Sequence, residues 1–355
     1  MRSREVPAEL HRPDNAVHEE APLDAQRPII DAHLHAWDYP AKFWNYIYPD
    51  GRPPPPRFLL PEVLQTIARG GHNVTRTVFI ECHSMYRADG PEELQAIGET
   101  EFANGIAAMS ASGGYGQCRV AAAIVGAANM RLGGRVKPVL EAQIAAGNGR
   151  FRGIRTLAGY TDANLLELPP DPSLKGLMRD GAFRRGVSAL ESLGLSLDVW
   201  CVHTQIPELS ELAAAFPRTT IILDHLGSPL DFGPYATREA EVFAQWKEAI
   251  IELSRRPNVM LKLGGLGSDL SVSLGTRRGN GSSPALAAKW RPYIETAIDR
   301  FGVDRCMFES NFPPDSAACT YGALWNAFKL IVAGYSEAEK SALFSGTAAR
   351  IYRLS

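Results

Sequence analysis

Eight short apolar runs, separated by longer helical stretches, constrain what this chain can fold into. Alternating strands and helices are typical of repeated βα units around a parallel sheet rather than of a β-sandwich. Eight units predict an α/β fold whose strands close a single (β/α)8 barrel, and 355 residues suit that fold. The expected strands are residues 28–35, 75–82, 119–125, 151–157, 195–202, 219–224, 258–263 and 304–309. The expected helices are residues 61–69, 91–112, 136–146, 175–193, 207–216, 237–256, 284–301, 322–332 and 338–352.

Two segments fall outside this repeat. Residues 1–27 are rich in charge and proline, which predicts an arm, mobile or strapped on the surface, before one barrel domain at residues 28–355. Residues 36–58 are rich in aromatic side chains and contain four consecutive prolines. We interpret this second segment as a loop over the site, with Trp37 as a candidate substrate contact. The alternatives are a protein contact surface or packing against the next helix.

Charge and cysteine content narrow the class of partner and compartment. Lys and Arg total 37 against 39 Asp and Glu, a formal net charge of -2, so we expect no nucleic acid or anionic membrane partner. A small molecule is the expected partner, and a homodimer is among the oligomeric states left open. The 5 cysteines are widely spaced, and neither a membrane span nor a secretory signal is evident. A reducing, cytoplasmic location is the expectation.

The first apolar run carries two histidines, at His33 and His35. In an extended strand Ile29, Asp31, His33 and His35 would share one face, and the intervening apolar residues the other. This pattern predicts a strand that lines a barrel and presents an imidazole pair near its carboxyl end, where a divalent metal could bind. The alternative is that the two histidines are incidental polar residues at the strand end.

Ionisable residues also follow most of the other expected strands. In a (β/α)8 barrel the active site lies at the carboxyl ends of the strands, so these residues are candidates for one common site. Chance placement would scatter the histidines through helices and loops. The strand-end residues are Glu81 and His83, Arg155, His203, Asp224 and His225, Lys262, and Glu309 and Asn311.

These motifs, in this order along the chain, resemble the amidohydrolase superfamily, and within it the amidohydrolase-related branch of lactonases and decarboxylases. The resemblance rests on Asp-Ala-His-Leu-His at 31–35, the histidine after the fifth strand, Leu-Asp-His-Leu-Gly at 223–227 and Cys-Met-Phe-Glu-Ser-Asn-Phe-Pro at 306–313. It implies a distorted TIM barrel that acts on esters, lactones, amides or carboxylates, often with one or two divalent metals. By position it makes His33, His35 and His203 metal ligands, and His225 the residue that orients water or the substrate carbonyl.

The chain departs from the family pattern at Asn311, where an aspartate is expected as ligand and general base. An amide cannot accept a proton at neutral pH, although its oxygen can accept hydrogen bonds or bind a metal weakly. Glu309 and Glu81 are the candidates for the missing carboxylate. We therefore expect at most one tightly held metal, zinc or manganese, with a metal-independent reaction as the alternative.

Arg155 and Lys262 suggest what the site binds. Positive charge near the mouth, with His83 and Trp37 beside it, would suit an anionic substrate such as a carboxylated lactone. The alternative is that each cation pairs with a carboxylate inside the barrel. The expected activity is hydrolysis of a small cyclic ester. A decarboxylase, hydratase or dehydratase on the same scaffold is the first alternative, and a non-catalytic binding barrel is the second.

Overall fold

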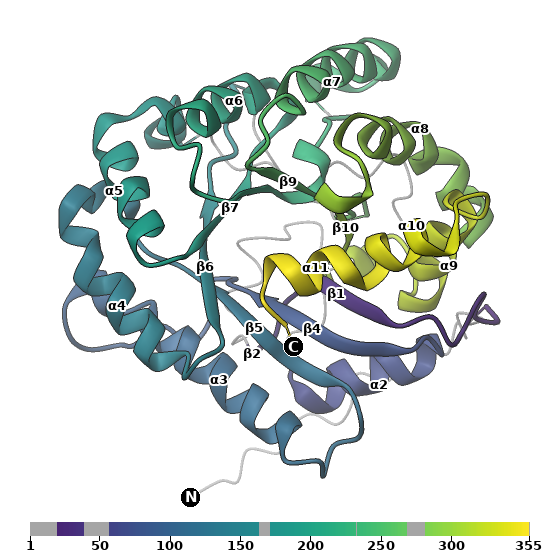
Figure 1. Cartoon of the computed structure of the whole chain (residues 1–355), viewed down its shortest axis with the longest axis horizontal. Helices are drawn as coiled ribbons and strands as arrows, with labels where there is room; N and C mark the ends of the chain where they lie inside the picture. Colours follow the sequence, from purple (N-terminus) through teal and green to yellow (C-terminus); the bar gives the residue numbers. More distant parts are fainter. Residues whose placement is uncertain (1–19, 39–56, 163–170, 232, 268–280, 355) are drawn as a thin grey trace, which may run out of the picture.

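The computed structural model describes residues 20–38, 57–162, 171–231, 233–267 and 281–354. Eight parallel strands follow one another around a barrel in chain order (Figure 1). The predicted fold is therefore confirmed, and each observed strand lies within or almost within its expected run. The strands are β1 (Ile29–Leu34), β4 (Val74–Ile80), β5 (Arg119–Gly126), β6 (Phe151–Leu157), β7 (Ser196–Trp200), β8 (Ile221–Leu223), β9 (Val259–Leu263) and β10 (Cys306–Phe308).

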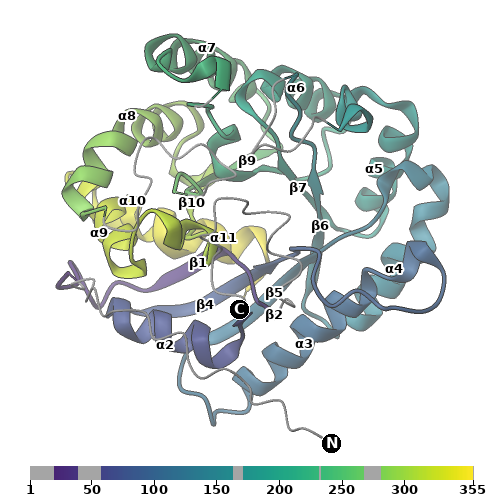
Figure 2. The same cartoon turned by 180° about the vertical axis from the view of Figure 1, so that it is seen from behind.

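A ring of helices surrounds the strands, as Figures 1 and 2 show from opposite sides. A large apolar core fills the space between strands and helices, as expected for βα units. No described helix is long and apolar enough to cross a membrane. The helices are α2 (Leu60–Gly70), α3 (Ile97–Ala111), α4 (Lys137–Ala146), α5 (Gly181–Ser192), α6 (Ile206–Ala215), α7 (Glu239–Leu253), α8 (Ser283–Phe301), α9 (Tyr321–Ile331), α10 (Glu337–Ser341) and α11 (Thr347–Ile351).

The barrel closes beside the two histidines of β1. Leu34 forms a parallel bridge with Phe312, four residues after the end of β10. The Asn311 amide donates to the His33 carbonyl at 2.9 Å, and the His35 amide donates to the Phe312 carbonyl at 2.9 Å. Because closure uses the backbone around Asn311, the segment after β10 is fixed against the His33–His35 pair.

The side-chain alternation expected for β1 is wrong at the start of the strand. Ile30 and Ala32 belong to the cluster inside the barrel, whereas Asp31 accepts a hydrogen bond from Tyr321 of helix α9 at 3.0 Å. The pairing of β1 with β4 shifts register between Asp31 and Leu34. This irregularity changes the phase of the strand, so that His33 points into the barrel although Asp31 does not.

The amino ends of the strands are covered by the C-terminal helix, which lies across the centre of the ring in Figure 1. Tyr352, directly after α11, packs with Ile30, Val78 and Met260 inside the barrel. Thr347 of α11 donates to the carbonyl of Val303, just before β10. The barrel interior is thus sealed at this end, and a ligand reaches it from the carboxyl ends.

Parts of the two non-repeat segments are described. Residues 20–27 lie against the helix ring, where Glu20 accepts from the Ser283 amide at 2.7 Å and Lys329 donates to the Leu23 carbonyl at 2.8 Å. Of the aromatic segment, β2 (Trp37–Asp38) pairs antiparallel with β3 (Arg57–Phe58), so its two ends meet. Residues 1–19 and 39–56 lie outside the described part, so the expected mobile arm and the loop over the site stay predictions.

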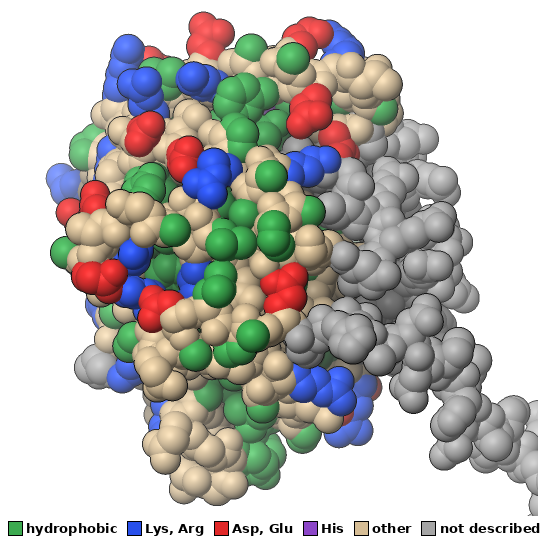
Figure 3. Space-filling model, turned by 90° about the vertical axis from the view of Figure 1, so that its right-hand side faces the viewer, with side chains coloured by type: hydrophobic (Ala, Val, Ile, Leu, Met, Phe, Trp, Pro, Cys, Tyr) green, Lys and Arg blue, Asp and Glu red, His purple; other side chains and the backbone are tan. Residues whose placement is uncertain are grey.

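The surface agrees with the charge balance of the sequence. On the face in Figure 3, Lys and Arg side chains are interspersed with Asp and Glu. That mixture gives this face no single-sign field for a polyanion.

Candidate active site

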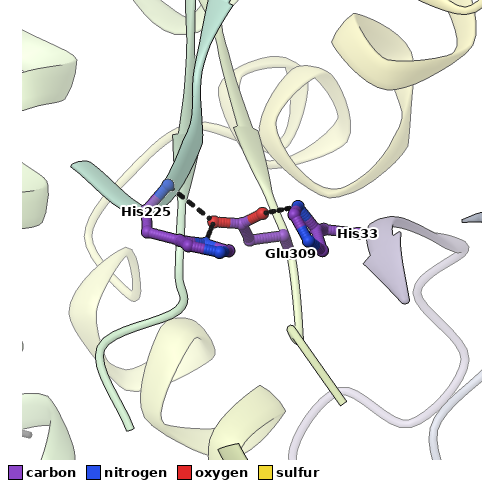
Figure 4. Close-up of side chains that lie close together, drawn as sticks. All are labelled: His33, His225 and Glu309. Atoms are coloured by element: carbon purple, nitrogen blue, oxygen red, sulfur yellow. Dashed lines mark hydrogen bonds and ion pairs between the residues drawn. The ribbon is translucent and has the colours of Figure 1, made fainter. Parts of the chain in front are cut away.

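Three side chains meet at the carboxyl ends of the strands (Figure 4): one from β1, one from the turn after β8 and one from the residue after β10. Glu309 lies between His225 and His33, and all three are buried. The Glu309 Oε1 atom is 2.7 Å from His225 Nδ1 and also accepts from the His225 amide at 3.1 Å. Its Oε2 atom is 3.0 Å from His33 Nδ1, without the alignment of a hydrogen bond. Each of the three residues offers one atom that could bind a metal ion, and these atoms lie within 4.8 Å of one another.

The Glu309–His225 contact determines which nitrogen of the imidazole carries the proton. An ionised carboxylate only accepts hydrogen bonds, so His225 Nδ1 carries the proton and donates it. The Nε2 atom of neutral His225 then keeps its lone pair and can accept a proton from a reactant. Burial alone raises the pKa of Glu309, but attraction to His225 and His33 outweighs burial and holds that pKa well below its usual range. The pair can therefore act as a general base with a charged partner.

Two glycines make room for this pair. Gly264 and Gly265 follow β9, and a Cβ atom at Gly265, where φ is +65°, would collide with the His225 ring. A Cβ atom at Gly264 would collide with Glu309. These glycines let the two catalytic candidates approach each other.

A second group of atoms converges on the other side of His33. His33 Nε2 and His35 Nε2 are 3.2 Å apart, and His35 Nε2 is also 3.2 Å from Asn311 Oδ1. His35 Nδ1 faces the Ile80 carbonyl at 2.9 Å, so this nitrogen carries the ring proton. Asn311 donates its Nδ2 proton to Asp315 at 2.8 Å, which turns its oxygen toward His35. Two lone pairs, on His35 and Asn311, therefore face each other.

This arrangement fits a divalent cation. Burial, with Lys262 nearby, lowers the pKa of His33 to about 4, and burial, with His33 nearby, lowers the pKa of His35 well below its usual value. Both rings are therefore neutral at pH 7, as metal ligands must be. A separation of 3.2 Å is the spacing of two nitrogens bound about 2.0–2.1 Å from one ion.

The balance of charges inside the barrel also favours a bound cation. Lys262 lies 2.8 Å from Asp198 and 2.9 Å from Asp224, and Arg155 pairs with Asp224 at 3.2 Å and with Glu81 at 3.6 Å. With Glu309, the four carboxylates exceed the two cations by two charges when the imidazoles are neutral. A buried excess of negative charge is costly unless a cation balances it. The chemistry of these residues thus suits one divalent ion held by His33, His35 and Asn311.

The two cations do not stand free at the mouth. Lys262 is fully buried and also contacts His33 Nδ1 at 3.1 Å, so it belongs to the ion network and not to the entrance. Arg155 is 9% exposed and faces the entrance while it pairs with Asp224 and Glu81. For both residues the alternative considered from the sequence, pairing inside the barrel, is what the structure shows.

His203 and Trp37 lie at the edge of the cluster. His203 accepts from the Leu230 amide at 3.3 Å and packs edge-on against Tyr235, so its described contacts are not with His33 or His35. Its role as a metal ligand stays a prediction. Trp37 stacks on His35 with ring centroids 5.9 Å apart. That stacking orients a metal-ligand candidate, and a direct contact of Trp37 with substrate stays a prediction.

A cavity of about 490 Å³ opens beside this cluster, at the carboxyl ends of β4, β5 and β6. Arg155 connects the two, because it lines the cavity and pairs with Asp224 of the cluster. Glu81 and His83, which follow β4, also line the cavity, whereas Glu309 and His225 are not among its lining residues. Its apolar wall includes Met130, Leu157, Leu177 and Phe183.

Three residues of the site were missed from the sequence. Asp198 lies in the middle of β7, and an isolated carboxylate within an apolar strand was the available signal. Asp315 orients Asn311, but nothing in the sequence distinguishes it from a loop aspartate. Tyr352, at the opposite end of the barrel, donates a hydrogen bond of 2.7 Å to Asp198, and no local pattern predicts that contact.

We expect Asn311→Asp to lower turnover and to destabilise the metal-free protein by about 2 kcal/mol or more. The new carboxylate would lose the hydrogen bond to Asp315 and place two buried carboxyl groups side by side. Urea unfolding without metal and steady-state kinetics measure the two effects. A gain in ester or lactone hydrolysis would contradict this account, because it would mean that Asn311 merely replaces a lost base.

Comparison with known proteins places this site in a family. The amidohydrolase family model matches residues 30–354. The chain belongs to the amidohydrolase family. A Sinorhizobium fredii protein described as uncharacterized, y4mH, is 32% identical over 92% of this chain and 98% of that protein. L-fucono-1,5-lactonase of Burkholderia multivorans is 26% identical over 92% of this amidohydrolase and 96% of the lactonase.

A solved structure extends the comparison. A Burkholderia multivorans amidohydrolase with bound zinc is 25% identical to this amidohydrolase, covers 92% of it and 99% of its own chain, and superposes with a TM-score of 0.69. The resemblance inferred from the strand-end motifs is therefore confirmed at the level of family and fold.

Proposed function

We propose that this amidohydrolase hydrolyses the ring ester of a small lactone. The buried Glu309–His225 pair carries the proposal, because it supplies a polarised base at the carboxyl ends of the strands. Arg155, which pairs with Asp224, links this cluster to a cavity large enough for one small ring. Two relatives named L-fucono-1,5-lactonase, both 26% identical, support the same reaction class.

The chain's own residues account for the proton transfers. His225 Nε2 removes a proton from water as the water oxygen bonds to the ring carbonyl carbon, and Glu309 stabilises the resulting imidazolium. The bond between that carbon and the ring oxygen then breaks, and the proton returns to the ring oxygen, giving a hydroxy acid. A divalent metal held by His33, His35 and Asn311 would polarise the carbonyl or the water.

Arg155 and Lys262 led us to expect a substrate that carries a carboxyl group. The structure gives a carboxylated lactone less support than a lactone without a carboxyl group. Lys262 is buried in the ion network, and the Arg155 guanidinium already contacts Asp224 and Glu81. The charge of each cation is therefore already balanced by carboxylates of the barrel, which weakens its attraction for a substrate carboxylate. Decarboxylation remains the competing reaction on this scaffold, and the identity of the product separates the two.

Purified protein with zinc or manganese added should open six-membered lactones, followed by acid release with a pH indicator. The panel should contain unsubstituted, hydroxylated and carboxylated rings, so that the reaction class and the substituents are tested separately. Failure to open any ring, with carbon dioxide released from a carboxylated one, would overturn the proposal.

A further inference from the structure

The Glu81 carboxylate has an oxygen without a partner. Glu81 follows β4 and is 1% exposed, and its Oε2 atom forms no hydrogen bond with a described residue. This oxygen lies 3.7 Å from His83 Nε2, beyond hydrogen-bond range, while the other carboxylate oxygen lies 3.6 Å from Arg155. A buried carboxylate oxygen left in this state is costly and calls for a donor.

The surrounding loop is built to hold Glu81 and His83 in place. Glu99 of helix α3 is buried, and its Oε1 atom accepts from the amides of Cys82 and Ser84, both at 2.9 Å. These amides flank His83, whose φ of 60° lies in the left-handed region. A loop pinned on both sides of a strained residue holds His83 beside Glu81.

The His83 side chain lies beside this oxygen and is itself exposed. Its side chain is 56% exposed, and its Nδ1 atom is 3.3 Å from the Tyr86 hydroxyl. Glu81, His83 and Tyr86 all line the cavity. A rotation of the exposed His83 ring would open the unpaired oxygen to a ligand in the cavity without any movement of the barrel.

The charges of the cavity lining decide what kind of ligand fits. Glu81, Glu92 and Glu93 outnumber Arg131 and Arg155, so the ionisable side chains of the lining carry an excess of negative charge. An anionic ligand would meet unpaired negative charge here. A hydroxyl group, by contrast, can donate to Glu81 Oε2, and the apolar wall can face the C–H groups of a ring.

We infer that Glu81 determines substrate specificity by accepting a hydrogen bond from a hydroxyl group of a neutral, hydroxylated lactone in this cavity. This inference rests on the proposed lactone hydrolysis and deepens it. Glu81 is then a binding residue, and the earlier hypothesis that it acts as the catalytic base gives way to the Glu309–His225 pair.

The test compares two rings that differ only in their substituents, δ-valerolactone and glucono-1,5-lactone. We expect the wild type to prefer the hydroxylated ring in kcat/KM by about tenfold or more. Glu81→Gln should reduce that preference by about tenfold, mainly through KM, since the neutral amide accepts more weakly than a carboxylate. Glu248→Gln, which removes an exposed carboxylate from helix α7, should leave the preference unchanged.

Two results would overturn the inference. Equal losses of turnover on both rings in Glu81→Gln would make Glu81 part of the chemistry, and an unchanged preference would remove it from recognition. Wild-type protein that opens neither ring would refute the proposed function itself, so the two failures are distinguishable.

A second measurement needs no variant. Lactones that each lack one hydroxyl should show an increase in KM of about tenfold at a single ring position of the wild type. KM values that do not depend on any hydroxyl would contradict the inference, even if Glu81→Gln proved too unstable to assay.

Discussion

Glu309→Gln should lower kcat by about two to four orders of magnitude while KM and the fold change little. The glutamine keeps the volume of the side chain, but its amide cannot stabilise a protonated His225 as the carboxylate does. It also offers an N–H group where His225 Nδ1 already donates, which favours the wrong tautomer. Single-turnover kinetics on the preferred lactone measure the chemical step, and circular dichroism checks the fold.

Glu81→Gln is the matched control for this prediction, because both residues are buried glutamates that follow barrel strands. Its effect should appear in the preference between hydroxylated and unsubstituted rings and not as a comparable loss of kcat on both. A large loss of kcat at Glu81, with Glu309→Gln unaffected, would move the base to strand β4 and would contradict the assignment.

Metal binding gives the second large effect. Protein purified without chelator or a histidine tag should hold up to one equivalent of zinc or manganese, and His35→Ala should bind zinc about 100-fold more weakly or worse. The loss follows from the lone pair that His35 directs toward Asn311 and His33. Calorimetric titration measures the affinity, and the increase in Tm on addition of zinc reports binding without any assay of turnover.

His203→Ala separates the two ligand sets. The resemblance makes His203 a ligand, whereas the geometry gathers Asn311 with His33 and His35. A zinc affinity of His203→Ala within about tenfold of the wild type would favour the set with Asn311. A loss as large as that of His35→Ala would place His203 in the ligand set. Metal-free protein with undiminished turnover would refute the metal-assisted mechanism and leave the Glu309–His225 pair to act alone.

The strands were predictable because each is a short, distinct apolar run, and parallel strands bring their carboxyl ends to one place. Glu309, His225 and His33 could therefore be assigned to one site from the sequence. The phase of β1 could not, because the register shift between Asp31 and Leu34 leaves no mark on the hydrophobic pattern. Alternation alone placed Asp31 in the barrel, where the structure places Ala32.

The ion-pair and hydrogen-bond partners of the site residues could not be predicted from the sequence either. Lys262 looked like a substrate contact because its partners, Asp198 and Asp224, come from other strands and sequence spacing does not relate them. The same holds for Glu99, which lies on the outer helix α3 and yet fixes the loop that carries His83. Local patterns identify which residues reach the site, whereas long-range contacts determine what each residue is free to do there.

The reaction itself is tested most directly by the product formed in water labelled with oxygen-18. The account predicts that this amidohydrolase opens a hydroxylated six-membered lactone, and that mass spectrometry finds one labelled oxygen in the carboxylate of the hydroxy acid. Release of carbon dioxide or loss of water from the substrate, without incorporation of the label, would contradict it.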